Sequence, residues 1–81
     1  MASTGSSSLA DAVLDARGLK CPLPVLKMEK QLDAMAPGAR LTVLATDPIA
    51  RIDIPLYCVQ HGHECATSSD GDVLSFAIVK A

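Results

Sequence analysis

The chain has 81 residues, of which 49% are apolar, and its formal net charge is −2. This length and apolar content predict one small globular domain built around a single hydrophobic core. The slightly acidic balance and the presence of only one Tyr and one Phe argue against direct binding of nucleic acid, which uses basic surfaces and aromatic stacking platforms.

The first ten residues are rich in Ser and lack both a cationic segment and an apolar segment. We therefore expect residues 1–10 to form a disordered tail that is neither a signal peptide nor a membrane anchor, and residues 11–81 to form the single domain. The chain has three cysteines, an odd number, so no complete disulfide framework can form: Cys21, Cys58 and Cys65. A reducing compartment, the cytoplasm, is the expected location.

The first structured segments predict a strand followed by a helix. Residues 12–16 are mostly apolar and are followed by Arg17-Gly18, as a short strand before a turn would be. A helix is expected next, because apolar residues recur at helical spacing and charged residues occupy the other side: Val25, Met28, Leu32 and Met35. Pro37-Gly38 ends this helix.

The second half of the chain predicts a strand, a helix and a hairpin. Residues 41–45 form an apolar strand. Pro55 argues against one unbroken helix from Pro48 to His61, so we expect a restart at Asp53-Ile54-Pro55 and a helix over residues 54–61. Asp70-Gly71 predicts a hairpin between strands 64–68 and 73–79. The resulting βαβαββ order predicts an α/β two-layer sandwich, a four-stranded mixed sheet with both helices on one face.

Cys21 is the candidate nucleophile. Pro22 and Pro24 fit the first turn of a helix, so Cys21 falls at the helix start, where the macrodipole and the nearby cations Arg17 and Lys20 are expected to favour a thiolate. A thioredoxin-type pair needs a second cysteine three residues on, but position 24 is proline. The pattern therefore favours a carrier with a single working thiol over a dithiol switch.

Several spaced motifs together resemble one known family. The segment from Leu14 to Val25 contains Cys-Pro-Leu-Pro, and it is followed in order by Asp47-Pro48, Asp53-Ile54-Pro55, Cys58 and Gly62-His63-Glu64. Over residues 11–80 this pattern resembles the TusA/SirA-like sulfur-carrier family. The resemblance implies the same βαβαββ sandwich and a sulfurtransferase role, in which the cysteine matching Cys21 carries sulfur as a persulfide.

In that family the sulfur comes from a protein donor, such as a cysteine desulfurase or a rhodanese, and goes to an acceptor protein. The routes lead to tRNA thiolation, molybdenum cofactor supply or sulfur metabolism. The resemblance implies that Cys21 is catalytic and is supported by Gly18, Pro22 and Pro24. Further contacts to the persulfide or to a partner are expected from Arg17, Lys20, Leu23 and Lys27. We expect no metal, no cofactor and no membrane association, and a monomer when the protein is alone.

Position 23 is an apolar Leu, where other members often carry a polar or acidic residue, and Val59-Gln60 lacks the aromatic or Met pair of some relatives. Both departures leave the identity of the donor and of the acceptor open.

Three other interpretations stay open at this point. The first is a zinc site, because four residues are of a type that binds zinc, although their spacing is irregular: Cys58, His61, His63 and Cys65. Thiols in the core and histidines in a turn account for these four residues better than a zinc site does. A regulatory or RNA-binding α/β module is a second alternative, which the missing basic stripe disfavours. A redox sensor built on the Cys21 thiol is the third.

Overall fold

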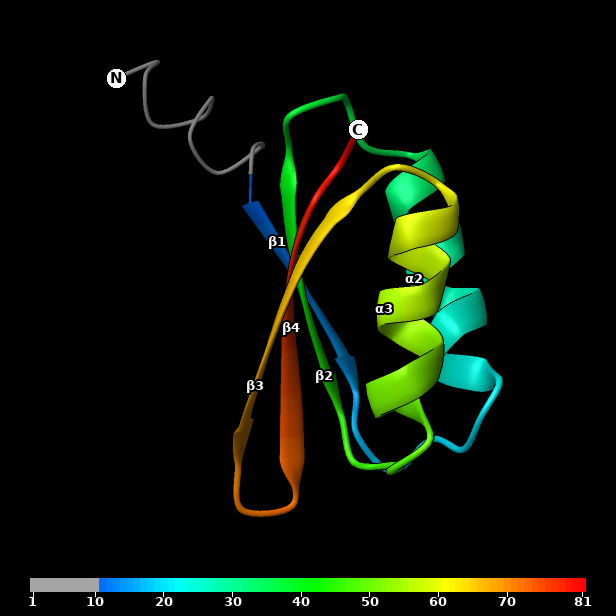
Figure 1. The fold of residues 1–81 in the computed structure, drawn as a ribbon, viewed down its shortest axis with the longest axis vertical. Coiled ribbons are helices and arrows are strands. Elements are labelled where there is room, and N and C mark those ends of the chain that lie inside the picture. The colour runs from blue at the N-terminus through cyan, green and yellow to red at the C-terminus, as the bar shows by residue number, and fades with distance from the viewer. Residues whose placement is uncertain (1–10) are drawn as a thin grey trace.

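The computed structural model describes residues 11–81, so the predicted tail over 1–10 lies outside the described residues (Figure 1). The elements follow in the predicted order: β1 (Asp11–Ala16), α2 (Leu23–Asp33), β2 (Arg40–Ala45), α3 (Ala50–Gln60), β3 (Glu64–Asp70) and β4 (Val73–Val79). Within this part of the chain, neither helix is long and apolar enough to cross a membrane.

The four strands form one mixed sheet in the order β1-β2-β4-β3. Strands β1 and β2 are parallel and are connected through α2, whereas β4 runs antiparallel to both β2 and β3. Both helices lie on the same side of this sheet (Figure 1). The predicted two-layer βαβαββ sandwich is therefore confirmed.

The core lies between the sheet and the helices. Alternate residues of the central strands point inward and are buried: Leu41, Val43 and Ala45 on β2, and Leu74, Phe76 and Ile78 on β4. Met28 and Leu32 of α2 and Ile54 and Cys58 of α3 cover them from the helical layer, each pair spaced four residues apart so that it shares one helix face. Burying each large apolar side chain contributes roughly 1.5–3 kcal/mol.

The predicted break before Pro55 is wrong. Helix α3 runs without interruption from Ala50 to Gln60, with Pro55 inside it. Proline has no N–H to donate to the carbonyl of Arg51, four residues earlier, so one helical hydrogen bond is absent. The helix persists because Ala50, Ile54 and Cys58 recur at a spacing of four and are all buried, and this burial outweighs the local cost of the proline.

The two crossover loops meet at one edge of the molecule. Strands β1 and β2 are parallel, so both end at the same edge, and the loops that follow them lead to the starts of α2 and α3 (Figure 1). This is the edge at which open α/β sheets place their chemistry.

Candidate functional site

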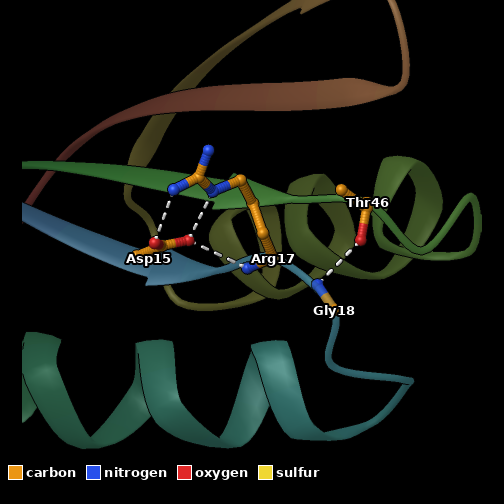
Figure 2. Close-up of polar contacts among 4 residues, drawn as sticks. All are labelled: Asp15, Arg17, Gly18 and Thr46. Atoms are coloured by element: carbon orange, nitrogen blue, oxygen red, sulfur yellow. Dashed lines mark hydrogen bonds and ion pairs between the residues drawn. The ribbon is translucent and has the colours of Figure 1, made fainter.

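Cys21 lies in the loop between β1 and α2, beside the loop that connects β2 to α3. The two loops are joined by a hydrogen bond in which the backbone N–H of Gly18 donates to Oγ1 of Thr46 at 2.8 Å (Figure 2). Gly18 has a φ of +81°, a left-handed conformation that residues with a Cβ adopt at a cost. Its role in the site is therefore to turn the chain toward α2.

The two prolines of the motif lie where the sequence predicted them, at the beginning of α2. Pro22 is the N-cap residue and follows Cys21 through a cis peptide bond, and Pro24 is buried in the first turn. The carbonyl of Pro22 accepts the first helical hydrogen bond, from the N–H of Leu26 at 3.0 Å. Cys21 therefore directly precedes the N-cap residue of α2 and is half-buried.

Two aspartates from the neighbouring loop and helix hold Cys21. The backbone N–H of Cys21 donates to Oδ2 of Asp47 at 2.7 Å, and the other oxygen of Asp47 accepts the N–H of Ile49 at 3.0 Å. The Cys21 thiol donates to Oδ2 of Asp53, in the first turn of α3, at 2.6 Å. The thiol and its backbone are thus each fixed by a separate carboxylate.

The expected lowering of the Cys21 pKa is wrong. The hydrogen bond to Asp53, followed by burial and by the negative charges of Asp53 and Asp47, raises the pKa of Cys21 to about 11. A carboxylate in direct contact with the sulfur outweighs the partial charge of a helix terminus. By contrast, the backbone N–H groups of Cys21 and Ile49 hold the pKa of Asp47 below its usual value.

The predicted basic contacts do not converge on the thiol. Asp15 and Arg17 are two residues apart at the end of β1 and share one face, so Arg17 binds Asp15 through two parallel contacts of 2.8 Å (Figure 2). The side-chain hydrogen bonds from Arg17 lower the pKa of Asp15 to about 2. The exposed Lys20 lies close enough to Asp47 for its charge to lower the pKa of that carboxyl, whereas Lys27 lines a hollow with Leu14 and Lys30 on the flank of α2.

Exposed apolar side chains lie near the cysteine loop and along the helical layer. Leu23, at the start of α2, is 46% exposed. Leu56 of α3 is 50% exposed and lines a shallow groove together with Pro22 and Asp53. The helical layer exposes further large apolar residues: Leu26, Ile49, Ile52 and Val59.

The other two cysteines belong to the packed interior. Cys58 has no exposed surface, and burial, followed by the nearby Cys65, raises its pKa to about 12. Cys65 is half-buried and packs against the core. A thiol in such surroundings is a poor nucleophile.

The histidines near the end of α3 stack rather than form a metal site. The ring of His61 stacks on Tyr57 with centroids 4.0 Å apart, and Nδ1 of His63 accepts the backbone N–H of Ala81. Among residues 11–81, no three His, Cys, Asp or Glu side chains are grouped so that they could hold a metal ion.

The roles of Asp47 and Asp53 were missed from the sequence. Both residues belong to the motifs that carry the family resemblance, Asp47-Pro48 and Asp53-Ile54-Pro55. Their distances from Cys21 along the sequence, 26 and 32 residues, did not predict that they contact it. The available signal was the parallel topology, which brings the ends of β1 and β2 to one edge.

Comparison with known proteins gives a consistent result. The family model described as Sulfurtransferase TusA matches residues 12–80. The sulfur carrier protein TusA of Pseudomonas aeruginosa (strain UCBPP-PA14) is 54% identical over 54 residues, covering 67% of this chain and 68% of that protein. The same-named protein of Pseudomonas putida (strain GB-1) is 52% identical over the same shares.

A solved structure shows the same fold. The crystal structure of the SirA-like protein from Desulfitobacterium hafniense superposes with a TM-score of 0.76 at 28% identity, covering 84% of this chain and 95% of that one. With the family model spanning almost all of the described residues, the chain belongs to the TusA family of sulfur carriers.

Proposed function

We propose that this protein relays sulfur as a persulfide on Cys21, between a donor protein and an acceptor protein. In loading, Sγ of Cys21 attacks the outer sulfur of a persulfide on the donor, and the donor cysteine leaves as a thiol. In discharge, a cysteine thiol of the acceptor attacks the outer sulfur on Cys21, the acceptor becomes the persulfide, and the Cys21 thiol is restored. No net oxidation accompanies either step, because one S–S bond forms as another breaks.

The observation that carries this proposal is the placement of Cys21 relative to the other two thiols. Cys21 lies in a surface loop between two helix starts, whereas Cys58 is fully buried and Cys65 packs against the core. Pro24 occupies the position at which a C-x-x-C protein has its resolving cysteine. A persulfide on Cys21 therefore has no adjacent thiol to discharge it.

We further propose a cysteine desulfurase or a rhodanese as the donor class, and acceptors in tRNA thiolation, molybdenum cofactor supply or sulfur metabolism. The membership in a sulfur-carrier family supports this assignment of partner classes. The protein would then act as a cytoplasmic monomer between successive partners. Leu23 lies two residues after Cys21, and Leu56 lines a groove with Pro22 and Asp53; these exposed side chains are the contacts that we assign to the partner.

Mass spectrometry of the intact protein tests the relay. After incubation with a cysteine desulfurase and cysteine, we expect the mass of one sulfur atom to be added to the wild type and to Cys65→Ser, but not to Cys21→Ser. The added sulfur should disappear on treatment with a small thiol. Absence of an adduct with every sulfane donor tried, or an adduct confined to Cys58 or Cys65, would contradict the proposal.

A further inference from the structure

We infer that Asp53 is the proton-relay residue of the Cys21 site, a role that rests on the sulfur relay proposed above. The geometry that leads to this assignment is the direct contact between the reacting sulfur and a carboxylate oxygen, in which the Cys21 thiol donates to Oδ2 of Asp53 at 2.6 Å. Asp53 touches the reacting atom itself, so its role is catalytic.

The contact is built by the fold rather than by local sequence. Asp53 lies in the first turn of α3, and the buried residues Ala50 and Ile54 on either side of it anchor that turn to the core. Asp47 independently fixes the backbone of Cys21 through its N–H at 2.7 Å. With both ends of the contact held, the thiol proton already points at a base before any partner arrives.

The charged groups around the thiol leave Asp53 as the proton acceptor. Asp47 accepts two backbone N–H groups, from Cys21 and Ile49, rather than the thiol of Cys21. Arg17 is bound to Asp15, and Lys20 is exposed and acts on Asp47. Among the described residues, Asp53 is the titratable side chain that hydrogen-bonds to the sulfur.

The relay balances protons and electrons in both directions. During loading, the Sγ–H bond breaks as Sγ forms its bond to the outer sulfur of the donor persulfide, and the proton moves to Oδ2 of Asp53. The electron pair of the breaking donor S–S bond goes to the donor cysteine sulfur, which takes the proton from Asp53. During discharge to a thiol acceptor, Asp53 takes the acceptor proton and returns it to Sγ of Cys21 as the S–S bond breaks.

The contact with Asp53 explains how Cys21 can react although its pKa is raised. A thiol whose pKa lies near 11 is almost entirely protonated at neutral pH, so a mechanism that waits for a free thiolate would be slow. A base in contact removes the proton as the new bond forms, and general base catalysis of this kind typically contributes about 10²- to 10⁴-fold. The same carboxylate thus keeps Cys21 protonated in the free protein and accepts the Cys21 proton when the sulfur attacks the donor.

The test compares two reactions of the same sulfur in the wild type and in Asp53→Asn. The first is alkylation by iodoacetamide, which consumes preformed thiolate. Removing the negative charge raises the thiolate fraction and slightly lowers its nucleophilicity, so Asp53→Asn should be alkylated about tenfold faster at about pH 8. The second is single-turnover loading of Cys21 from cysteine persulfide, followed by mass spectrometry.

Loading should respond in the opposite direction. The wild-type rate should change little between about pH 6.5 and pH 8.5, whereas the rate of Asp53→Asn should fall about tenfold per pH unit on acidification, as expected for a thiolate-only route. Asp33→Asn is the matched control, since it removes a carboxylate at the end of α2 away from Cys21, and its loading profile should stay flat. Circular dichroism and the Tm establish that each variant is folded.

The outcomes separate this inference from the relay itself. A flat loading profile in Asp53→Asn, or equal slowing of alkylation and loading as from a distorted loop, would overturn the role of Asp53 while leaving the carrier function in place. If wild-type Cys21 takes no sulfur from any sulfane donor, the carrier function fails. In that case the alkylation rates still measure the effect of Asp53 on the thiol.

Discussion

At the scale of single residues, the environment of Cys21 is set by carboxylates that come from distant parts of the chain. The helix start and the flanking cations predicted a thiolate, yet Asp53 contacts the sulfur and Asp47 holds the backbone N–H. The pKa of Cys21 is therefore raised to about 11, so the sulfur rests as a thiol that is hydrogen-bonded to Asp53.

Gly18 allows a prediction that separates conformation from function. No atom lies within 4 Å of a Cβ added at Gly18 or at Gly38, and both have positive φ values, +81° and +88°. Replacing either by Ala should therefore cost the same roughly 1–2 kcal/mol of unfolding free energy, the penalty for a left-handed backbone. Urea denaturation measures this cost.

Only Gly18→Ala should also slow the loading of Cys21, because Gly18 leads into the cysteine loop and is tied to Thr46, whereas Gly38 follows α2 at the opposite end of that helix. Equal loading rates in the two variants, measured under conditions where both are folded, would show that the turn at Gly18 does not position the thiol.

Asp47 gives the site a dependence of stability on pH. Its pKa in the folded protein is lowered by the backbone N–H groups of Cys21 and Ile49. A lowered pKa stabilises the fold above the ordinary Asp value of about 3.9, and this stabilisation is lost as the pH falls through the folded value.

The Tm of the wild type should therefore fall more steeply than that of Asp47→Asn below about pH 4. Asp15, whose pKa is also lowered, is present in both proteins and cancels in the difference. Parallel Tm curves from acidic to neutral pH would show that these two backbone contacts do not stabilise the fold.

At the scale of elements, the sequence pattern predicted the order and type of every helix and strand, because each signal is local. Apolar spacing marked α2, β-branched runs marked the central strands, and Asp70-Gly71 marked the hairpin. The start of α3 was predicted four residues late. The prediction applied the local rule against proline inside a helix and took no account of Ala50, which is buried on the N-terminal side of Pro55. The Asp53 contact was missed for a related reason: it forms only when the cysteine loop and the first turn of α3 meet, and the two residues in contact are 32 positions apart in the sequence.

Pro55 provides the prediction for α3. In Pro55→Ala the backbone N–H returns and can donate to the carbonyl of Arg51, so the free energy of unfolding should rise by about 1 kcal/mol. Pro48 is the matched control, since it lies before the helix begins at Ala50 and removes no helical hydrogen bond. Pro48→Ala should give no gain, because a proline outside the helix mainly restricts the unfolded chain. A gain in Pro48→Ala equal to that in Pro55→Ala would contradict a helix-specific cost at Pro55.

At the scale of the whole molecule, the two faces differ in what they offer a partner. The helical layer covers one side of the sheet (Figure 1). Cys21 lies in the loop between β1 and α2, at the edge where both helices begin. The exposed apolar residues of the helical layer include Leu56, which lines a groove with Pro22 and Asp53. The other side of the sheet carries a row in register across three strands, Val13, Thr42 and Ala77, and Val13 is 69% exposed. Among residues 11–81, both faces thus display apolar surface, and on the helical face part of it lines a groove with Pro22, the neighbour of Cys21, and Asp53, its hydrogen-bond partner.

This asymmetry predicts where a protein donor must contact the carrier. Leu56→Asp places a charge in the groove beside Cys21 and should slow loading from a cysteine desulfurase by at least about tenfold, since a buried unpaired charge at an interface costs more than 1.4 kcal/mol. Loading from cysteine persulfide, which needs no protein contact, should change little. Val13→Asp is the matched control, with an exposed apolar residue replaced on the open sheet face, and both of its loading rates should equal those of the wild type.

Slowing of both reactions in Leu56→Asp would indicate that the charge disturbs Asp53 or the thiol rather than a partner. Slowing of the desulfurase reaction in Val13→Asp alone would move the contact to the sheet. The comparison therefore assigns the donor to one face of the molecule. The loading rate from cysteine persulfide depends on the thiol alone, whereas the rate from a cysteine desulfurase depends on the thiol and on the surface that the enzyme contacts.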